Sequence, residues 1–205
     1  MKTLFISAKL KSKINKSKIL EISKKLPKNI AIAYSIQYIN HAKEINDLLK
    51  KNHNVTRFLQ VLGCSKPALP KSTQAILLIG DGKFHAISLA FESKLPVHLL
   101  SHNKLELISK KEIKTLEKKQ KVAHLKFLHS DQVGILVSTK PGQQSLSKAL
   151  KLKKSIKDKK SYLFLSNNIN TSEFENFPQI QSWVNTACPR LDIEGEFVNM
   201  IKIKS

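Results

Sequence analysis

The chain has 205 residues, of which 41% are hydrophobic, so it is long enough to bury one large core or two smaller ones. Its longest apolar runs, Ala75–Gly80 and Val133–Val137, fall far short of the roughly 20 residues that a membrane-spanning helix needs. The first residues lack the apolar core of a signal peptide. We therefore expect a globular, cytoplasmic protein that has no membrane partner.

The chain is strongly basic. Its net charge of +21 comes from 36 Lys and Arg against 15 Asp and Glu, a balance typical of proteins with a nucleic-acid or other polyanionic partner. Arg57 and Arg190 are the only arginines, however, whereas base readout and bidentate phosphate contacts favour arginine. Composition alone therefore leaves two interpretations open, a polyanion-binding surface and an ordinary solvated lysine surface.

Apolar runs alternate with amphipathic, lysine-faced stretches, which predicts strands alternating with helices. In the first half the expected strands are Thr3–Leu10, Asn29–Ile36, Val55–Cys64, Ala75–Gly82 and Pro96–Ser101. The expected helices are Ile14–Leu26, which Pro27 ends, Asn40–Asn52 with Asn40 as its cap, and Phe84–Lys94.

A long helix from about Lys110 to His129 leads into the second half. There we expect strands Val133–Gln143, Ser161–Asn168 and Ile180–Pro189, a helix over Gln143–Lys159, and a short helical or loop stretch over Glu173–Ile180. Repeated strand, helix and strand predict parallel sheets with right-handed crossovers. The fold class is therefore α/β, with two parallel-sheet domains at residues 1–117 and 118–205.

The glycines and cysteines are placed in a pattern. Both cysteines, Cys64 and Cys188, and five of the six glycines lie at or just past the carboxyl ends of expected strands. Ligands bind at this edge in open parallel sheets, because the loops and helix N-termini there present unpaired backbone N–H groups. This placement lets two thiols remote in sequence converge on one site. Their spacing alone, without a CxxC pair, favours buried free thiols.

Taken singly, the motifs fit ordinary structural roles. GDGKFH is not a Walker loop, and its glycines fit a strand-to-helix turn. His85 fits a helix-start cap as well as a catalytic base. STKPGQ fits a plain turn, and Trp183 fits a core position.

Together, four segments resemble motifs of the diphthamide biosynthesis family, the 2-(3-amino-3-carboxypropyl)histidine synthases of archaeal type, in the family's order. They are QVLGCSKP (Gln60–Pro67), IGDGKFHAISLA (Ile79–Ala90), GILVSTKPGQ (Gly134–Gln143) and WVNTACPRLDIE (Trp183–Glu194). SIQYI (Ser35–Ile39) is similar more weakly. The resemblance covers nearly the whole chain, and four ordered motifs are more specific than any one of them.

The resemblance implies an architecture and a chemistry. Family members have three related α/β domains around a central cleft, and each domain offers one cysteine to a [4Fe-4S] cluster whose fourth iron position stays open for S-adenosylmethionine. A 3-amino-3-carboxypropyl fragment of that cofactor is added to a histidine ring carbon of translation elongation factor 2. Residues 1–117 would be the family's middle domain and residues 118–205 its third.

The resemblance also implies site residues. Cys64 and Cys188 resemble the middle-domain and third-domain cluster ligands. Lys140 and nearby backbone N–H groups would face the carboxylate of the cofactor's methionine part. Asp81 stands where the family commonly has Ser or a small residue, and Arg190 fits either a carboxylate partner or a structural tie. The implied cofactor-binding residues are Gln37, Gly80, Asp81, Gly82, His85, Ser138, Thr139, Lys140, Gln143 and Arg190.

The first domain of the family has no counterpart here, because Met1 falls where the middle domain should begin. Two thiolates seldom hold an iron-sulfur cube, which takes three or four cysteines. We therefore expect a transferase that works with an electron donor and with a partner chain, or as a homodimer. The alternatives are a non-catalytic accessory subunit and a lysine-rich RNA or ribosome-surface binding protein, although direct RNA binding is not expected.

Overall fold

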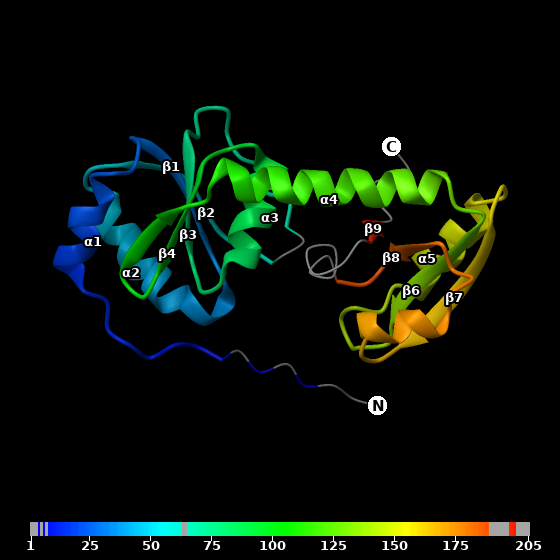
Figure 1. Cartoon of the computed structure of the whole chain (residues 1–205). Helices are drawn as coiled ribbons and strands as arrows, with labels where there is room; N and C mark the ends of the chain where they lie inside the picture. The colour runs from blue at the N-terminus through cyan, green and yellow to red at the C-terminus, as the bar shows by residue number, and fades with distance from the viewer. Residues whose placement is uncertain (1–3, 5, 7, 63–64, 189–196, 200–205) are drawn as a thin grey trace. The chain divides into compact units, whose positions relative to one another are not determined.

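The structure is a computed structural model of the chain, and it describes residues 4, 6, 8–62, 65–188 and 197–199. Two compact units make up the chain, Met1–Ile113 and Lys114–Ser205, and the border between them lies inside helix α4 (Lys110–Leu128). Each unit has its own sheet, as Figure 1 shows. The predicted α/β class with parallel sheets is confirmed. The predicted domain border after residue 117 falls in the same helix, and the assignment of the domains to the family's middle and third domains stays a prediction.

The first unit is built on a five-stranded sheet with the order β2-β1-β3-β4-β5. Its first four strands run parallel, and the last returns antiparallel to its neighbour. The strands are β1 (Asn29–Tyr34), β2 (Asn54–Gln60), β3 (Ala75–Ile79), β4 (Val97–Ser101) and β5 (Lys104–Leu107). All five residues of β3 are buried, as expected for a central strand that is covered on both faces.

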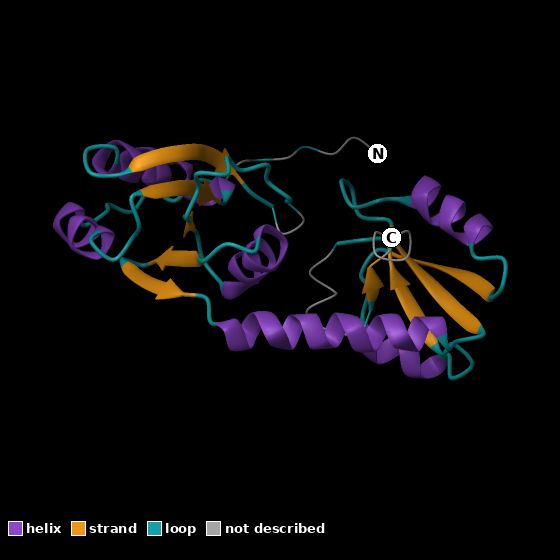
Figure 2. Ribbon diagram, turned by 90° about the horizontal axis from the view of Figure 1, so that it is seen from above, coloured by secondary structure: helices purple, strands orange, loops and turns teal. Residues whose placement is uncertain are grey.

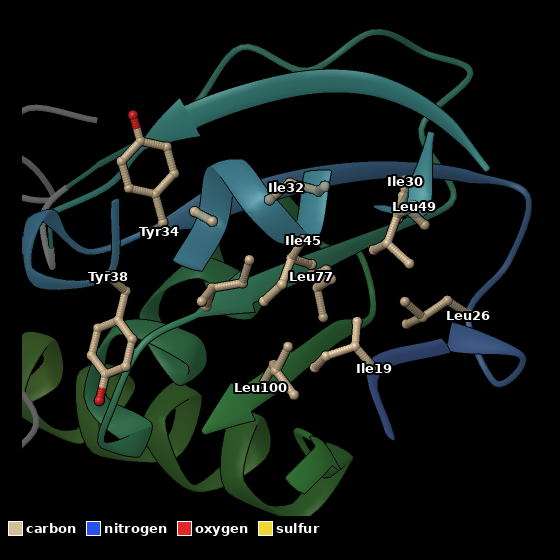
Figure 3. Close-up of a cluster of buried hydrophobic side chains, with 12 residues drawn as sticks. Ile19, Leu26, Ile30, Ile32, Tyr34, Tyr38, Ile45, Leu49, Leu77 and Leu100 are labelled. Atoms are coloured by element: carbon tan, nitrogen blue, oxygen red, sulfur yellow. The ribbon is translucent and has the colours of Figure 1, made fainter. Parts of the chain in front are cut away.

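Helices lie on both faces of this sheet, as Figure 2 shows. They are α1 (Lys16–Ser23), α2 (Ile39–Leu49), which follows the 3-10 helix η1 (Ile36–Tyr38), and α3 (Lys83–Ser93). On one face, α1 and α2 bury apolar residues such as Ile19, Ile45 and Leu49 against the strands. Figure 3 shows this cluster, with Tyr34 and Tyr38 at one end of it. On the other face, α3 contributes Ala86, Leu89 and Ala90.

The second unit has a four-stranded parallel sheet with the order β7-β6-β8-β9. Its elements after α4 are β6 (Gln132–Ser138), α5 (Leu146–Ser155), β7 (Lys160–Ser166), the 3-10 helix η2 (Thr171–Asn176), β8 (Ser182–Asn185) and β9 (Val198–Asn199). Helices α4 and α5 cover one face through Phe127, Ala149 and Leu152. No helix in the described part of the chain has the length and hydropathy to cross a membrane.

The other face of this sheet carries an aromatic cluster around Trp183. The indole stacks on the ring of Phe174, with centroids 4.1 Å apart, and meets Phe164 edge-on at 4.7 Å. In the strand register Trp183 lies opposite Gly134, and a Cβ atom added there would overlap the indole ring. The glycine inside β6 is thus explained by the close approach of Trp183.

The side chain of Lys159 hydrogen-bonds to backbone carbonyls at the carboxyl end of α4. Its side chain is only 9% exposed, and its ammonium donates to the carbonyls of Leu128 and Ser130, at 3.0 and 2.9 Å. The same ammonium lies 5.5 Å from the centroid of the Phe127 ring. The Leu128 carbonyl is among those that a helix end leaves unpaired, so Lys159 has a structural role.

The predicted strand Thr3–Leu10 is wrong. The described residues of this range are not in a strand, and the Leu4 and Ile6 side chains are each 82% exposed. The N–H of Leu10 donates to the carbonyl of Gln37, at 2.8 Å, so it bonds η1 rather than a neighbouring strand. A short apolar run that joins no sheet gains neither ladder bonds nor a packed face, so its composition misleads.

Neither of the two helix caps considered from the sequence, Asn40 and His85, holds a cap position. Because η1 runs directly into α2, Asn40 lies inside that helix and Tyr38 holds the cap position. His85 lies within α3, whose cap position is Gly82. β5 is an unpredicted strand, joined to β4 by His102 and Asn103, whose φ values of 48° and 60° form a tight hairpin turn.

His98 in β4 makes the stability of the first unit sensitive to acid. Burial lowers the pKa of this side chain below its ordinary value of 6.5. Below that pH the unfolded chain takes up a proton that the folded chain refuses, so stability is lost as the pH falls from 6.5 toward the folded pKa. We expect the urea midpoint, followed by circular dichroism, to be higher at pH 7.5 than at pH 5.5, and His98→Gln to reduce that difference.

His129→Gln, at an exposed position, is the matched control and should leave the difference unchanged. An unaltered pH dependence in His98→Gln would show that His98 is not a source of the acid sensitivity.

Candidate functional site

The strand order of the first unit creates a switch point between β1 and β3. From β1 the chain crosses to β2 on one side and then to β3 on the other. In open α/β sheets, ligands bind outside the carboxyl ends of the strands at such a point. The two segments that flank it are Ser35–Tyr38 after β1 and Gly80–Gly82 after β3. They contain four of the predicted site residues, Gln37, Gly80, Asp81 and Gly82.

The backbone brings these two segments together. The N–H of Ser35 donates to the carbonyl of Ile79, at 3.2 Å, and a Cβ atom on Gly80 would lie 3.4 Å from the Ser35 hydroxyl oxygen. Gly82 has a φ of 75°, which only glycine adopts readily, and it leads into α3. The side chain of Gln37 is exposed in η1, and His85 lies in α3, edge-on to Phe84.

A hydrogen-bonded chain links Asp81 to β4. Oδ1 of Asp81 accepts from the N–H of Gly82, at 2.9 Å, and from the hydroxyl of Ser101, at 3.1 Å. The Ser101 hydroxyl lies 2.9 Å from Nδ1 of His102. A hydroxyl has one hydrogen, and that of Ser101 points to Asp81, so Nδ1 of His102 is the donor in this second bond.

Tyr38 and Lys83 define the charges around this turn. Burial, and secondly the charge of Asp81, raise the pKa of Tyr38, so its phenol stays protonated at neutral pH. Lys83 forms ion pairs with Glu106 and Glu112, and these hydrogen bonds, that to Glu106 first, raise its pKa. The lysine of the GDGK turn is thus engaged by carboxylates on β5 and α4.

A pocket of about 60 Å³ lies beside the switch point in the first unit. Its walls combine apolar side chains with polar groups on its rim. The lining residues are Leu10, Ser12, Lys13, Ile14, Ile19, Tyr38, His41, Ile45, Ile79, Leu100, His102 and Asn103. The N-terminal segment closes one side, because Nε2 of His41 donates to the carbonyl of Ser12 at 2.5 Å.

The second unit repeats this topology. Its switch point lies between β6 and β8, and the segments after these strands are the predicted STKPGQ turn and the loop with Cys188. The turn is held locally. The N–H of Lys140 donates to the buried Ser138 hydroxyl at 3.2 Å, and the N–H of Thr139 donates to Ser166 at 3.0 Å. Gln143 closes the turn by donating its N–H to the carbonyl of Lys140 at 3.0 Å.

The loop before Cys188 is fixed by two side chains at the end of β8. Asn185 donates Nδ2–H to the carbonyl of Cys188, at 3.0 Å, and accepts from the N–H of Ala187, at 2.8 Å. Thr186 donates both its N–H and its hydroxyl to the carbonyl of Leu136 in β6. Cys188 is a free, half-buried thiol at the carboxyl edge of the sheet. A thiol so placed fits the geometry of a metal ligand on a defined loop.

The predicted site residues are grouped within each unit. Gln37 and the Gly80–Gly82 turn flank one switch point in the first, and the Ser138–Gln143 turn and Cys188 flank one switch point in the second. Cys64 and Arg190 lie outside the described residues.

The donors do not complete the ligand set of a cluster. Nowhere in residues 8–62, 65–188 and 197–199 do three or more His, Cys, Asp or Glu gather to hold a metal ion. The whole sequence has two cysteines, whereas a [4Fe-4S] cube takes three or four. Cys188 suits one ligand position, and the remaining ones need donors beyond this pair.

Sequence reasoning gave no individual role to Ser101, His102, Tyr38 or Asn185, although the last two lie in quoted motifs. Ser101 and His102 follow β4 at the same carboxyl edge as the other candidates, so the strand-end rule applied to β4 would have found them. The side chain of Asn185 acts through hydrogen bonds to its own loop, and nothing in its spacing indicates them.

Comparison with known proteins gives one family. The family described as "Putative diphthamide synthesis protein" matches residues 1–198. Among curated proteins, the 2-(3-amino-3-carboxypropyl)histidine synthase of Methanocaldococcus jannaschii is 30% identical over 95% of this chain and 57% of its own length. The enzyme of the same name from Pyrococcus horikoshii is 27% identical over 83% of this chain and 53% of its own length.

Solved structures agree in fold. The crystal structure of Dph2 from Pyrococcus horikoshii with a 4Fe-4S cluster matches with a TM-score of 0.78 and 24% identity, over 94% of this chain and 62% of that one. A second crystal structure of that protein matches with a TM-score of 0.73 and 27% identity, over 90% and 57%. The chain thus spans between about half and three fifths of the length of these relatives. The family match covers nearly all of it, and the chain belongs to the diphthamide synthesis protein family.

Proposed function

We propose that this chain is part of the enzyme that transfers a 3-amino-3-carboxypropyl group to a histidine of translation elongation factor 2. One observation carries the proposal: in a member of this family, a half-buried free thiol, Cys188, lies on a hydrogen-bonded loop at the switch point of its sheet. The curated relatives bear the name of that synthase, and a relative of the same fold is described with a 4Fe-4S cluster.

In this proposal Cys64 and Cys188 each supply a thiolate to a [4Fe-4S] cluster, and a partner chain or a second copy supplies the rest. We include a partner because the sequence has two cysteines, whereas a [4Fe-4S] cluster takes three or four cysteine ligands. The cluster, once reduced by an electron donor, would supply the chemistry that activates S-adenosylmethionine. The reaction would take place in the cytoplasm, where the elongation factor works.

The chain's own residues would bind and orient the cofactor. The Ser138–Gln143 turn holds Lys140 half-buried at the switch point, where its ammonium suits a carboxylate. Gln37 and the Gly80–Gly82 turn would line the corresponding edge of the first unit. Arg190 is proposed to pair with a carboxylate of the site, and His85 to lie near the cofactor.

Cluster content tests the proposal. A tagged copy of the chain, purified without oxygen from its native host together with any chain that copurifies, should contain about four iron and four acid-labile sulfide per complex, the content of one cube. The chain purified alone should contain clearly less, because two thiolates leave the cube under-ligated. Cys64→Ala/Cys188→Ala, purified in the same way, is the matched control.

A complex without acid-labile sulfide would contradict the proposed cluster. If histidine modification in cells survives the loss of both cysteines, the chain is instead an accessory subunit.

A further inference from the structure

The segments that follow the parallel strands of the first sheet contain a single acidic residue, Asp81. These segments are residues 35–38, 61–74, 80–82 and 102–103, and Asp81 is the only Asp or Glu among them. Of the two lysines in these segments, Lys66 pairs with Glu92 in α3, at 2.9 Å. Within these segments negative charge is therefore confined to one carboxylate, and the neighbouring Glu106 and Glu112 are paired with Lys83.

The carboxylate of Asp81 is held in place by one of its oxygens. Oδ1 accepts from the N–H of Gly82 and from the hydroxyl of Ser101. That hydroxyl in turn accepts a hydrogen bond from Nδ1 of His102, which orients it. Within the described residues, Oδ2 has no hydrogen-bond donor and Asp81 has no Lys or Arg partner. The turn thus presents an oriented acceptor with its charge unpaired, and an oriented acceptor binds a donor cation with less loss of entropy than a mobile one.

The surroundings of Asp81 limit the kind of cation that its carboxylate can bind. Tyr38, whose phenol remains neutral beside the carboxylate, and His102 both line the adjacent pocket, whose walls include Ile79 and Leu100. A phenol oxygen can accept a second hydrogen bond from a donor that already bonds Asp81. Such a site fits a cation that donates several hydrogen bonds and carries an apolar chain. A lone carboxylate is a poor metal site, because hard cations take six or more oxygen ligands.

We propose that Asp81, oriented by Ser101 and His102, binds the primary ammonium group of an amino-acid ligand at the switch point of the first sheet. The inference rests on the proposed function, because the 3-amino-3-carboxypropyl group carries such an ammonium. The inference concerns the ammonium alone and assigns it to the first unit.

Asp81→Asn tests the inference cleanly. Asparagine keeps an Oδ1 acceptor for Gly82 and Ser101 and removes the charge, so the turn is expected to keep its shape. The probes are S-adenosylhomocysteine and its deaminated counterpart, in which hydrogen replaces the ammonium. Binding is measured by calorimetry at pH 7.5 with the complex purified from the native host. The wild type should prefer the first ligand by about tenfold or more, which corresponds to about 1.4 kcal/mol.

In Asp81→Asn the preference should fall to about twofold or less, because an amide carries no charge to stabilise an ammonium. Asp47→Asn, an exposed change of the same charge in α2 of this unit, is the control and should keep the full preference. A merely structural role, in which Asp81 favours the N-terminus of α3, predicts a lower urea midpoint in Asp81→Asn with the ligand preference intact.

Three outcomes overturn the inference: a preference retained by Asp81→Asn, no preference in the wild type, or no binding of either ligand. The proposed function is judged separately, by iron and sulfide content. A complex that holds a cluster but binds both ligands equally would contradict only the inference. A complex that prefers the ligand with the ammonium but holds no cluster would contradict only the proposed function.

Discussion

Cys188→Ser is expected to lower modification of the elongation-factor histidine by at least about 100-fold while the chain stays folded. Outer residues that only hydrogen-bond to metal ligands already cost 10- to 100-fold when they are replaced, so the loss of a ligand should cost more. Serine nearly matches cysteine in size, and the loop is held by Asn185 and Thr186 through the backbone rather than through the thiol. Mass spectrometry of the histidine-containing peptide, from cells that carry only the variant, measures the effect.

The alternative explanation of Cys188 is a free thiol that only fills space. It predicts a small loss of stability and unchanged modification of the histidine. Comparing the urea midpoint with the modified fraction in the same variant separates the two, since a ligand affects the second and a packing residue the first. Full modification in Cys188→Ser cells would remove Cys188 from the site.

Gly134→Ala is expected to destabilise the second unit by about 3 kcal/mol, the upper part of the usual range for overpacking. The added methyl group would overlap the Trp183 ring and lie 3.1 Å from Cγ2 of Ile180. A shift of the ring would disturb its neighbours, because it is stacked on Phe174 and meets Phe164 and Phe177 edge-on. Trp183 is the only tryptophan of the chain, so its fluorescence in urea reports on this unit.

Gly80→Ala provides a control for the same chemical change. Its added methyl group would meet only the Ser35 hydroxyl, at 3.4 Å, an ordinary contact distance. Circular dichroism in urea should therefore show nearly wild-type unfolding for Gly80→Ala, against an early transition for Gly134→Ala. Equal midpoints for the two variants would mean that the aromatic cluster can open without cost.

Most of the fold could be predicted from the sequence, because the buried strands are strongly patterned. Runs such as Ala75–Ile79 and Val133–Val137 are uniformly apolar and lie between helices whose apolar residues follow helical spacing. The prediction fails where the pattern is short. β5 and β9 have four and two residues, and they are strands only because a neighbour offers its edge. Residues 8–10 fail in the opposite way, because they belong to a predicted strand but are not in a strand in the structure.

The candidate site could be predicted in part. The rule that ligand groups follow parallel strands led to Gly80–Gly82, Ser138–Gln143 and Cys188, and the structure puts these segments at the two switch points. The partners of these residues could not be predicted, because they come from distant parts of the chain. Ser101 reaches Asp81 only through the register of β3 and β4, and a strand pattern does not give that register.

Lys159 is a lysine of this chain that its neighbours cannot replace. Lysine and asparagine codons differ by a single base, and at solvated positions an exchange between the two residues is expected to be nearly neutral. At position 159 an asparagine is too short to reach the carbonyls of Leu128 and Ser130, which would then lose their donor. Purifying selection is therefore expected to maintain the lysine codon at position 159, while its neighbours in the same lysine-rich stretch vary.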